Sequence, residues 1–393
     1  MVSGAETDCD VAVLGGGIAG LWILDRLRAQ GFRAVLLERS ALGDGQTIAA
    51  QGIVHSGLKY HVSRDLTLDV LAAMPARWQA ALAGRDGPDL RAARVLSSKF
   101  HFWVPPRFGA ELVARAAREV ARSDTGVVPR SDWPAPFCGP QTGGALSIVS
   151  ESVLDVASVL GALAERHRDV VRLLPAAPLT MQDNRLACGP LSLRPRCIVM
   201  TAGAGNERLP AALGVPAVPC QRRPLQQVVV SGMREPVYAH CLGVSVKPLA
   251  TVTSHPDGAG GWFWYVGGGL AETGAGMAPE RLLRTAREDL PAWFPGADFS
   301  QAGWVSFPVD RAEFGGDPGT RPGDVQVEQR ENVLVAWPTK LALAPRLADV
   351  VIERVAGIVG AVAGRPAALP DAFAALAEPE IALPPWRRIA AWS

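Results

Sequence analysis

The pattern of hydrophobic positions at the start of the chain predicts a strand, a helix and a second strand in close succession. Residues 10–14 and 34–37 are short apolar runs, which are typical of buried strands. Between them apolar side chains recur every three or four residues, which predicts a helix that begins near Ile18 and stops at Gly31. The opening of the chain therefore predicts a βαβ unit.

The hydrophobic pattern changes in the second half of the chain. Residues 219–269 contain short β-rich runs separated by turn residues, which predicts an antiparallel sheet. Segments of βα type also occur at 152–201 and 332–363. We therefore expect an α/β fold: a Rossmann-like domain with a βαβ dinucleotide unit, assembled from discontinuous pieces, and an α+β domain that contains the antiparallel sheet.

The expected domain boundaries follow these changes of pattern. The dinucleotide-binding domain is predicted to comprise residues 1–90, 146–215 and 300–393, and the substrate domain residues 91–145 and 216–299. With 393 residues, the chain is long enough for two domains that each have a core.

Four further segments have patterns that a structure can test. The stretch after Glu38 is rich in small residues and is expected to run extended across a bound cofactor. Residues 94–104 predict a strand, and residues 111–122 predict a helix. Another helix is expected to begin near Ser152, with Ser152 or Asp155 as its cap.

The composition is that of a globular protein and argues against several classes of function. Hydrophobic residues make up 48% of the chain and charged residues 20%, which excludes a disordered chain. The 39 basic residues are scattered and balanced by 38 acidic ones, so no nucleic-acid-binding surface is predicted. The six cysteines form no C-x-x-C pair and no Cys/His ligand spacing. We therefore predict no metal, and reduced thiols in the cytoplasm.

The sequence predicts no membrane-spanning segment. The N-terminus lacks the charged and apolar regions of a signal peptide. The best apolar candidate, 350–363, is interrupted by Glu353 and Arg354. The tail 384–389 mixes aromatic and basic residues, which allows peripheral membrane contact, although packing back on the domain is the favoured interpretation.

Three glycines in the opening unit have the spacing G-x-G-x-x-G. In this motif the first, here Gly15, permits a tight turn, and Gly17 lets the backbone approach a pyrophosphate. Gly20 lets the helix pack on the strand, and the helix N-terminus offers N–H groups to phosphates. Glu38, at the end of the second strand, can accept hydrogen bonds from ribose hydroxyls and disfavours the 2′-phosphate of NADP.

The complete context makes this motif more specific than the glycines alone. Strand, helix, second strand and terminal acid all occur within about 30 residues, as the dinucleotide-binding unit requires. A glycine-rich turn without a ligand is therefore the less favoured interpretation. The unit by itself does not separate FAD from NAD.

Five segments, in chain order, resemble the D-amino-acid oxidase superfamily of two-domain flavoproteins. They are the opening unit that ends in Glu38-Arg39, the stretch GIVHSGLKY at 52–60, SVLD at 152–155, IVMTAGA at 198–204 and WPTKLALAP at 337–345. The second segment looks like the G-x-x-H-x-G-x-x-Y stretch of L-2-hydroxyglutarate oxidases and, more loosely, of FAD-dependent glycerol-3-phosphate dehydrogenases. The resemblance covers nearly the whole chain and implies FAD, which we expect to be bound non-covalently because the 52–60 stretch contains no cysteine.

The motif and the resemblance together predict which residues contact FAD. These are Gly15, Gly17, Ile18, Ala19, Gly20, Glu38, Arg39, Thr47, Gln51, Gly52, Val54, Ala202, Gly203, Thr339, Lys340 and Leu341. Two segments depart from the family pattern. The loop at 337–340, which is rich in glycine in many members, is Trp-Pro-Thr-Lys here, and Gln-Arg-Arg-Pro at 221–224 stands where an Arg-Gly pair often opens the substrate-domain strand. Both departures lie near the expected substrate and leave its identity open.

His55 is the predicted catalytic base. In the related hydroxy-acid enzymes the matching histidine lies beside the flavin, and the intrinsic pKa of an imidazole suits the removal of a hydroxyl proton. The alternatives are a histidine that orders the loop, one that bonds a flavin oxygen, or, less favoured, a covalent flavin link. Lys340 is a second catalytic candidate, because a cation near the flavin would stabilise its anionic reduced form. It could equally be a solvated lysine.

A carboxylated substrate would need a cation to hold it. The candidates are Arg222, Arg223 and Arg311, since guanidinium groups bind carboxylates in a bidentate way. Arg311 is also predicted to be a catalytic residue. Each could instead lie on the surface or in an ion pair. Tyr60 and Tyr265 are predicted to line the substrate pocket, although aromatic residues on strands are often part of the core.

These observations predict an FAD-dependent oxidoreductase that oxidises a CH–OH carbon of a small, carboxylated molecule by hydride transfer to flavin N5. Oxygen, a quinone or an electron-transfer protein would then reoxidise the flavin. Oxidation of an amine or amino acid to an imine is the first alternative. A flavin-binding partner subunit without turnover is the second.

Overall fold

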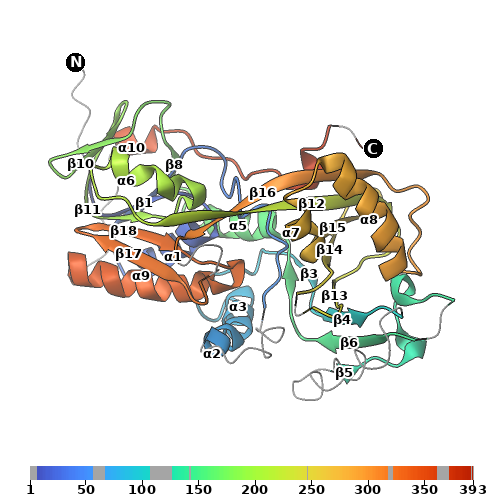
Figure 1. Ribbon diagram of the computed structural model, residues 1–393. Coiled ribbons are helices and arrows are strands. Elements are labelled where there is room, and N and C mark those ends of the chain that lie inside the picture. Colours follow the sequence, from blue (N-terminus) through green and yellow to red (C-terminus); the bar gives the residue numbers. More distant parts are fainter. Residues whose placement is uncertain are drawn as a thin grey trace.

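The computed structural model places two large sheets side by side, joined by long strands (Figure 1). The fold is mixed α/β, as the hydrophobic pattern predicts. The description below covers residues 7–55, 67–106, 126–140, 143–245, 247–316, 322–360, 371–390 and 392.

The first sheet contains the predicted βαβ unit at its centre. Its main strand order is β17-β18-β11-β1-β2-β8, and β1 pairs in parallel with both β2 and β11. The strands are β1 (Thr7–Leu14), β2 (Ala34–Glu38), β8 (Val171–Leu173), β9 (Thr180–Gln182), β10 (Arg185–Cys188), β11 (Leu191–Met200), β17 (Gln326–Arg330) and β18 (Val333–Trp337).

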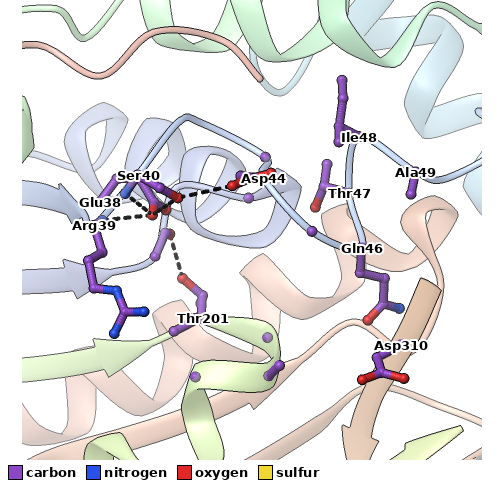
Figure 2. A pocket seen from close by; sticks show the side chains of 18 of the residues that line it. Glu38, Arg39, Ser40, Asp44, Gln46, Thr47, Ile48, Ala49, Thr201 and Asp310 are labelled. Carbon is purple, nitrogen blue, oxygen red and sulfur yellow. Dashed lines mark hydrogen bonds between the residues drawn. The ribbon is translucent and has the colours of Figure 1, made fainter. Parts of the chain in front are cut away.

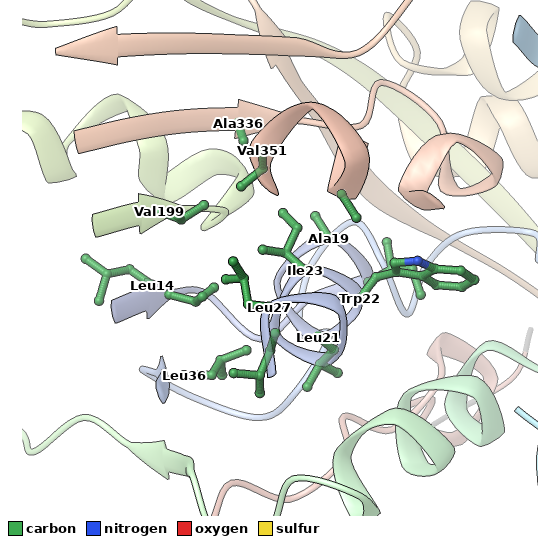
Figure 3. Close-up of a cluster of buried hydrophobic side chains, with 14 of the residues drawn as sticks. Leu14, Ala19, Leu21, Trp22, Ile23, Leu27, Leu36, Val199, Ala336 and Val351 are labelled. Atoms are coloured by element: carbon green, nitrogen blue, oxygen red, sulfur yellow. The ribbon is translucent and has the colours of Figure 1, made fainter. Parts of the chain in front are cut away.

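The core of this part lies between the sheet and two helices, α1 (Ile18–Ala29) and α9 (Ala344–Val359). Figure 3 shows side chains of α1, such as Ile23 and Leu27, packed among residues of the sheet and of α9. Helix α5 (Val156–Glu165) also contacts α1. Burial on both sides explains why β1 and β2 are apolar runs instead of alternating strands.

The second sheet has the strand order β16-β12-β15-β14-β13-β4-β6-β5, and its pairs are antiparallel except for β13 with β4. The long strands β12 and β16 reach from this sheet toward the first (Figure 1). The strands are β4 (Phe100–Val104), β5 (Gly126–Val127), β6 (Ala145–Val149), β12 (Cys220–Met233), β13 (Ala239–Cys241), β14 (Ala250–Pro256), β15 (Trp262–Gly267) and β16 (Trp304–Phe314).

Shorter elements complete the fold. Helices α7 (Gly269–Gly274) and α8 (Pro279–Trp293) pack on the second sheet, and β3 (Val95–Ser97) pairs with β7 (Val153–Leu154). The remaining helices are α2 (Thr67–Ala72), α3 (Met74–Leu82), α6 (Leu209–Ala212) and α10 (Asp371–Ala374), with 3-10 turns η2 (Arg130–Asp132), η3 (Ala135–Phe137), η4 (Gly203–Glu207), η5 (Leu341–Leu343) and η6 (Pro385–Arg387).

Three local expectations are wrong. The stretch after Glu38 forms successive turns instead of running extended, because glycines at 43 and 45 adopt positive φ angles. The strand expected at 94–104 is two strands, β3 and β4. The helix expected near Ser152 begins only at Val156, as α5, because the residues after Ser152 first pair with β3; Asp155, one of the two expected caps, is its cap. The helix expected at 111–122 lies outside the described residues.

The sheet pairing also differs from the expected domain ranges at two strands. β6 and β16 belong to the second sheet, although the ranges 146–215 and 300–393 place them with the dinucleotide-binding part. Strand β16 joins the second sheet because it pairs along its whole length with β12. The division into two domains and the boundaries between them stay predictions.

Candidate functional site

A cavity of about 1260 Å³ opens at the carboxyl ends of the parallel strands of the first sheet. Leu14, Glu38, Leu174 and Thr201, which end or follow β1, β2, β8 and β11, all line it. Ligands of open α/β sheets bind at this edge, where the strand order reverses, here on either side of β1. Figure 2 shows Glu38 and Arg39 on one side of the cavity and Gln46 and Asp310 on the other.

Two glycines of the motif have the conformational roles predicted for them. Gly15 has a φ of 112°, which favours glycine, and an added Cβ would lie 2.7 Å from the backbone of Thr201. At Gly20 a Cβ would lie 1.9 Å from the carbonyl oxygen of Gly15, so only glycine lets α1 pack against the end of β1. These contacts fix the position of the helix N-terminus.

Gly17 faces the cavity and is closed in by Thr47. An added Cβ would lie 2.9 Å from Thr47 Oγ1, and this hydroxyl accepts a hydrogen bond from Ile18 N at 3.3 Å. Gly17 is also the N-cap of α1 and has no side chain to cover the first-turn amides. Such a glycine-lined helix N-terminus fits a pyrophosphate. The residues present therefore suit a dinucleotide such as FAD.

Glu38 joins the end of β2 to the glycine turn. Its Oε2 accepts a hydrogen bond from Gly16 N at 2.6 Å, and Oε1 accepts from the backbone N–H groups of Arg39 and Ser40 at 2.7 and 3.0 Å. These bonds fix the carboxylate at the cavity wall (Figure 2). Oε2 receives a single donor among the described residues and has a further lone pair with which it could accept from a ribose hydroxyl.

The second sheet holds the next part of the cavity wall by polar contacts. Gln46 Oε1 accepts from Ala312 N at 3.0 Å, and the Tyr265 hydroxyl donates to Ala49 O at 2.6 Å. Gln51 Nε2 donates to Thr251 O and Tyr265 O, at 2.8 and 3.0 Å. Tyr265 and Gln51 thus fasten the segment that follows the turn, which the resemblance places at the flavin.

The three candidate arginines are all in ion pairs. Arg223 makes a bidentate pair with the buried Glu313, and Arg222 pairs with Glu207 at 2.8 Å. Arg311 Nη1 lies 3.3 Å from Glu272, and burial lowers the pKa of its guanidinium. Only Arg222 lines the cavity.

His55 lies beside a buried carboxylate. Its Nδ1 is 3.5 Å from Glu151 Oε2, and the two side chains are 17% and 4% exposed. The fully buried His240 stacks with His55 at a centroid distance of 5.8 Å and an angle of 14°. Neither Glu151 nor His240 is predictable from the sequence, because nothing in their local pattern marks them.

The structure brings only some of the predicted site residues together. Those that line the cavity are Gly15, Gly17, Glu38, Arg39, Thr47, Ala202, Gly203 and Arg222. Those outside its lining are Ile18, Ala19, Gly20, Gln51, Gly52, Val54, His55, Arg223, Tyr265, Arg311, Thr339, Lys340 and Leu341. Tyr60 falls outside the described residues, and the roles proposed for all of these residues stay predictions.

Several polar and aromatic side chains of the cavity have no counterpart in the prediction. They are Ser40, Asp44, Gln46, Arg208, Phe307 and Arg388. The Gly-Asp-Gly turn at 43–45 could have indicated the first three, since such residues favour turns. No local signal points to Arg388, which reaches the cavity from the C-terminal tail and pairs with Asp44 at 2.9 Å.

Comparison with known proteins decides the family. Residues 10–353 match the DAO family, described as FAD dependent oxidoreductase. The chain belongs to this family. It is 38% identical over 390 residues to the probable FAD-dependent oxidoreductase PA4991 of Pseudomonas aeruginosa, covering 96% of this chain and 97% of that protein. This DAO-family chain is therefore an FAD-dependent oxidoreductase, as the five segments imply.

Solved structures support the same fold. The crystal structure of PA4991 aligns with a TM-score of 0.82 at 35% identity, over 98% of this chain and 99% of that one. Glycine oxidase from Geobacillus kaustophilus aligns at 0.64 with 17% identity, covering 93% and 97%. Reduced L-alpha-glycerophosphate oxidase from Mycoplasma pneumoniae, with FAD bound, aligns at 0.62 with 16% identity, covering 88% and 94%. The last two show the shared fold alone.

Proposed function

We propose that this DAO-family enzyme oxidises a CH–OH carbon of a small, carboxylated molecule. The observation that carries the proposal is the placement of His55, an imidazole whose Nδ1 lies 3.5 Å from a buried carboxylate. A histidine in such a setting can take a proton and keep its charge compensated. An alcohol needs this base, because its hydroxyl proton must leave as the carbon becomes a carbonyl.

Each group of the chain then has a defined task. The glycine turn, Thr47 and Glu38 would hold the dinucleotide, and FAD would supply the two-electron acceptor for the hydride. His55 takes the hydroxyl proton, so that the substrate loses one hydride and one proton. Arg311 is proposed to hold the substrate carboxylate.

Two further parts of the proposal concern charge and reoxidation. Lys340 would stabilise negative charge that develops on the reduced cofactor, as a nearby cation does. Oxygen, a quinone or an electron-transfer protein would take up the electrons afterwards.

Among the described residues, no helix combines the length and apolar character that a bilayer crossing requires.

A substrate panel tests this proposal. Under anaerobic conditions the holoenzyme is mixed with 2-hydroxy acids, their methyl esters, glycerol phosphate, and the matching amino acids. We expect bleaching of the visible flavin band by a hydroxy acid and much slower bleaching by its ester, which lacks the carboxylate. Bleaching by amino acids alone would replace the alcohol with an amine. Bleaching by none would favour a partner subunit without turnover.

A further inference from the structure

A buried group of ionisable side chains lies beside the proposed base, outside the cofactor cavity. Glu151 is 3% exposed and His240 is fully buried. One nitrogen of His55, one nitrogen of His240 and one carboxylate oxygen of Glu151 lie within 4.8 Å of one another. Burial of a carboxylate costs free energy unless a partner compensates its charge, so the position of Glu151 beside two histidines indicates an interaction with them.

Backbone pairing places His55 and Glu151 opposite each other. Ile53 and Val153 form an antiparallel bridge, and the hydrogen bonds Leu154 N to Gly52 O and Val54 N to Ser152 O, both 2.9 Å, continue it. In an antiparallel register, two residues further along one chain face two residues back on the other. His55 therefore lies across from Glu151, at the spacing of a cross-strand pair.

His240 reaches the pair from the second sheet and is itself fixed. On β13 it lies opposite Phe102 of β4, with which it stacks at 5.8 Å, and Phe100 meets it edge-on at 4.8 Å. Its Nδ1 is 2.8 Å from Thr251 Oγ1 of the neighbouring strand β14. These contacts leave the ring little freedom to turn away from His55.

The contact between His55 and Glu151 is that of a pair that can share a proton, because His55 Nδ1 lies 3.5 Å from the carboxylate oxygen Oε2. His240 Nδ1 is already 2.8 Å from Thr251 Oγ1. Tyr238, in the hydrophobic cluster that contains Ile53 and Phe100, stays neutral because burial raises its pKa.

We infer that Glu151 is a positioning residue: it holds the His55 imidazole at Nδ1 and compensates the charge that the ring gains when a substrate proton arrives at Nε2. His240 keeps the pair in place from the second sheet. The inference rests on the proposed function of His55 as the base. The separation of 3.5 Å would shorten when the ring becomes charged, as contacts in catalytic sites often do on forming the reactive complex.

The test uses the FAD-loaded protein with isotope-labelled histidine, and no substrate. The sequence has six histidines, so their resonances can be assigned by substitution, beginning with His55→Gln. Replacing Glu151 by Gln removes the charge and keeps the shape. We expect the pKa of His55 to fall by about one unit or more in Glu151→Gln, because a carboxylate within about 4–6 Å favours the charged ring. Glu151→Asp should retain most of the wild-type value.

A matched control lies elsewhere in the chain. Asp25 is a buried carboxylate whose Oδ1 is 2.9 Å from Nε2 of His167. Asp25→Asn removes a buried carboxylate of the same kind and should leave the titration of His55 unaltered. Flavin absorbance of each variant shows whether it has folded.

Wild-type protein supplies a second readout that needs no variant. Above the pKa of His55, nitrogen-15 shifts should show the tautomer protonated at Nδ1, the atom that faces Glu151. The Nε2–H tautomer, or an unchanged pKa in Glu151→Gln, would overturn the inference. So would one equivalent of Zn²⁺ that abolishes the titration of both His55 and His240. Because no substrate is present, failure of the alcohol panel and failure of this pairing are separate results.

Discussion

Gly17 is the residue at which an added side chain would compete with the cofactor for space. The first carbon of that side chain would already lie 2.9 Å from Thr47 Oγ1, before any phosphate is present. We predict that Gly17→Val abolishes flavin binding while the protein still folds. The measurement is the ratio of flavin to protein absorbance after purification, with circular dichroism to verify the fold.

The same substitution elsewhere gives the control. Gly357 lies on the exposed side of α9, and an added Cβ there meets nothing within 4 Å. Gly357→Val should keep a full complement of flavin. A folded Gly17→Val protein with normal flavin content would show that the glycine serves only the fold.

His55 is the residue whose loss should affect chemistry without affecting cofactor binding. A positioned base contributes about a hundred- to ten-thousand-fold to proton transfer. With an alcohol substrate, His55→Ala should therefore slow anaerobic flavin reduction by roughly that factor at unchanged flavin content. Stopped-flow absorbance of wild type and variant across pH measures it.

The pH profile separates the two chemistries at this residue. A neutral amine already has a free lone pair and needs no strong base, so its oxidation would depend little on His55. Reduction would then accelerate as pH rises through the ionisation of the amine itself. A small effect of His55→Ala together with that profile would remove the alcohol proposal and leave the amine one.

At the scale of elements, the local sequence pattern predicts a helix or strand when the spacing of its apolar residues shows which face is buried. The apolar runs of β1 and β2 and the helical spacing of α1 are visible in the sequence. Membership of β16 in the second sheet is not, because it depends on pairing with β12, which lies more than seventy residues earlier. Asp155 caps α5 for a similar reason: the pairing of β7 with β3 delays the helix.

The C-terminal 3-10 turn η6 covers a buried histidine of β14. The Trp386 ring stacks on His255 at 3.9 Å, and burial lowers the pKa of His255 from 6.5 to about 3. Below about pH 6.5 the unfolded chain therefore binds a proton that the folded one does not. We predict that the proton taken up by unfolded His255 lowers the free energy of unfolding by up to about 1.4 kcal/mol for each unit that the pH falls from 6.5 toward about 3. Above pH 6.5 this loss is absent, because His255 is then neutral in both states.

His255→Phe tests this sign, because it keeps a planar ring against Trp386 and removes the titration. Urea unfolding at about pH 7.5 and about pH 5 should show a smaller loss of stability in the variant than in wild type. Equal losses in the two proteins would mean that other groups cause the acid sensitivity.

At the scale of the whole molecule, the cavity at the edge of the first sheet is assembled from segments that are far apart in the sequence. The glycine turn, the passage after β11, β16 and the tail at 385–390 all line it. The first two carry motifs and are predictable. The others reach the cavity through pairing and through the Asp44–Arg388 ion pair, which no local pattern encodes. His55 is predictable as a candidate because it lies in a local motif. Its partners Glu151 and His240 reach it only through the pairing of distant strands, so they are recognised only in the folded protein.

The last prediction concerns how this cavity holds FAD. Cys188 is the cysteine that lines it, and burial raises the pKa of its thiol, so the nucleophilic thiolate is disfavoured. We therefore expect non-covalent FAD, so that heat or acid releases the yellow colour into the supernatant, and colour that stays with precipitated protein would contradict this. Since FAD would bind only the folded chain, returning it to the stripped protein at about 100 times its Kd should raise the unfolding free energy by about 2.7 kcal/mol. Thermal unfolding with and without added FAD measures that gain, and an unchanged Tm would mean that the folded, stripped protein does not bind FAD.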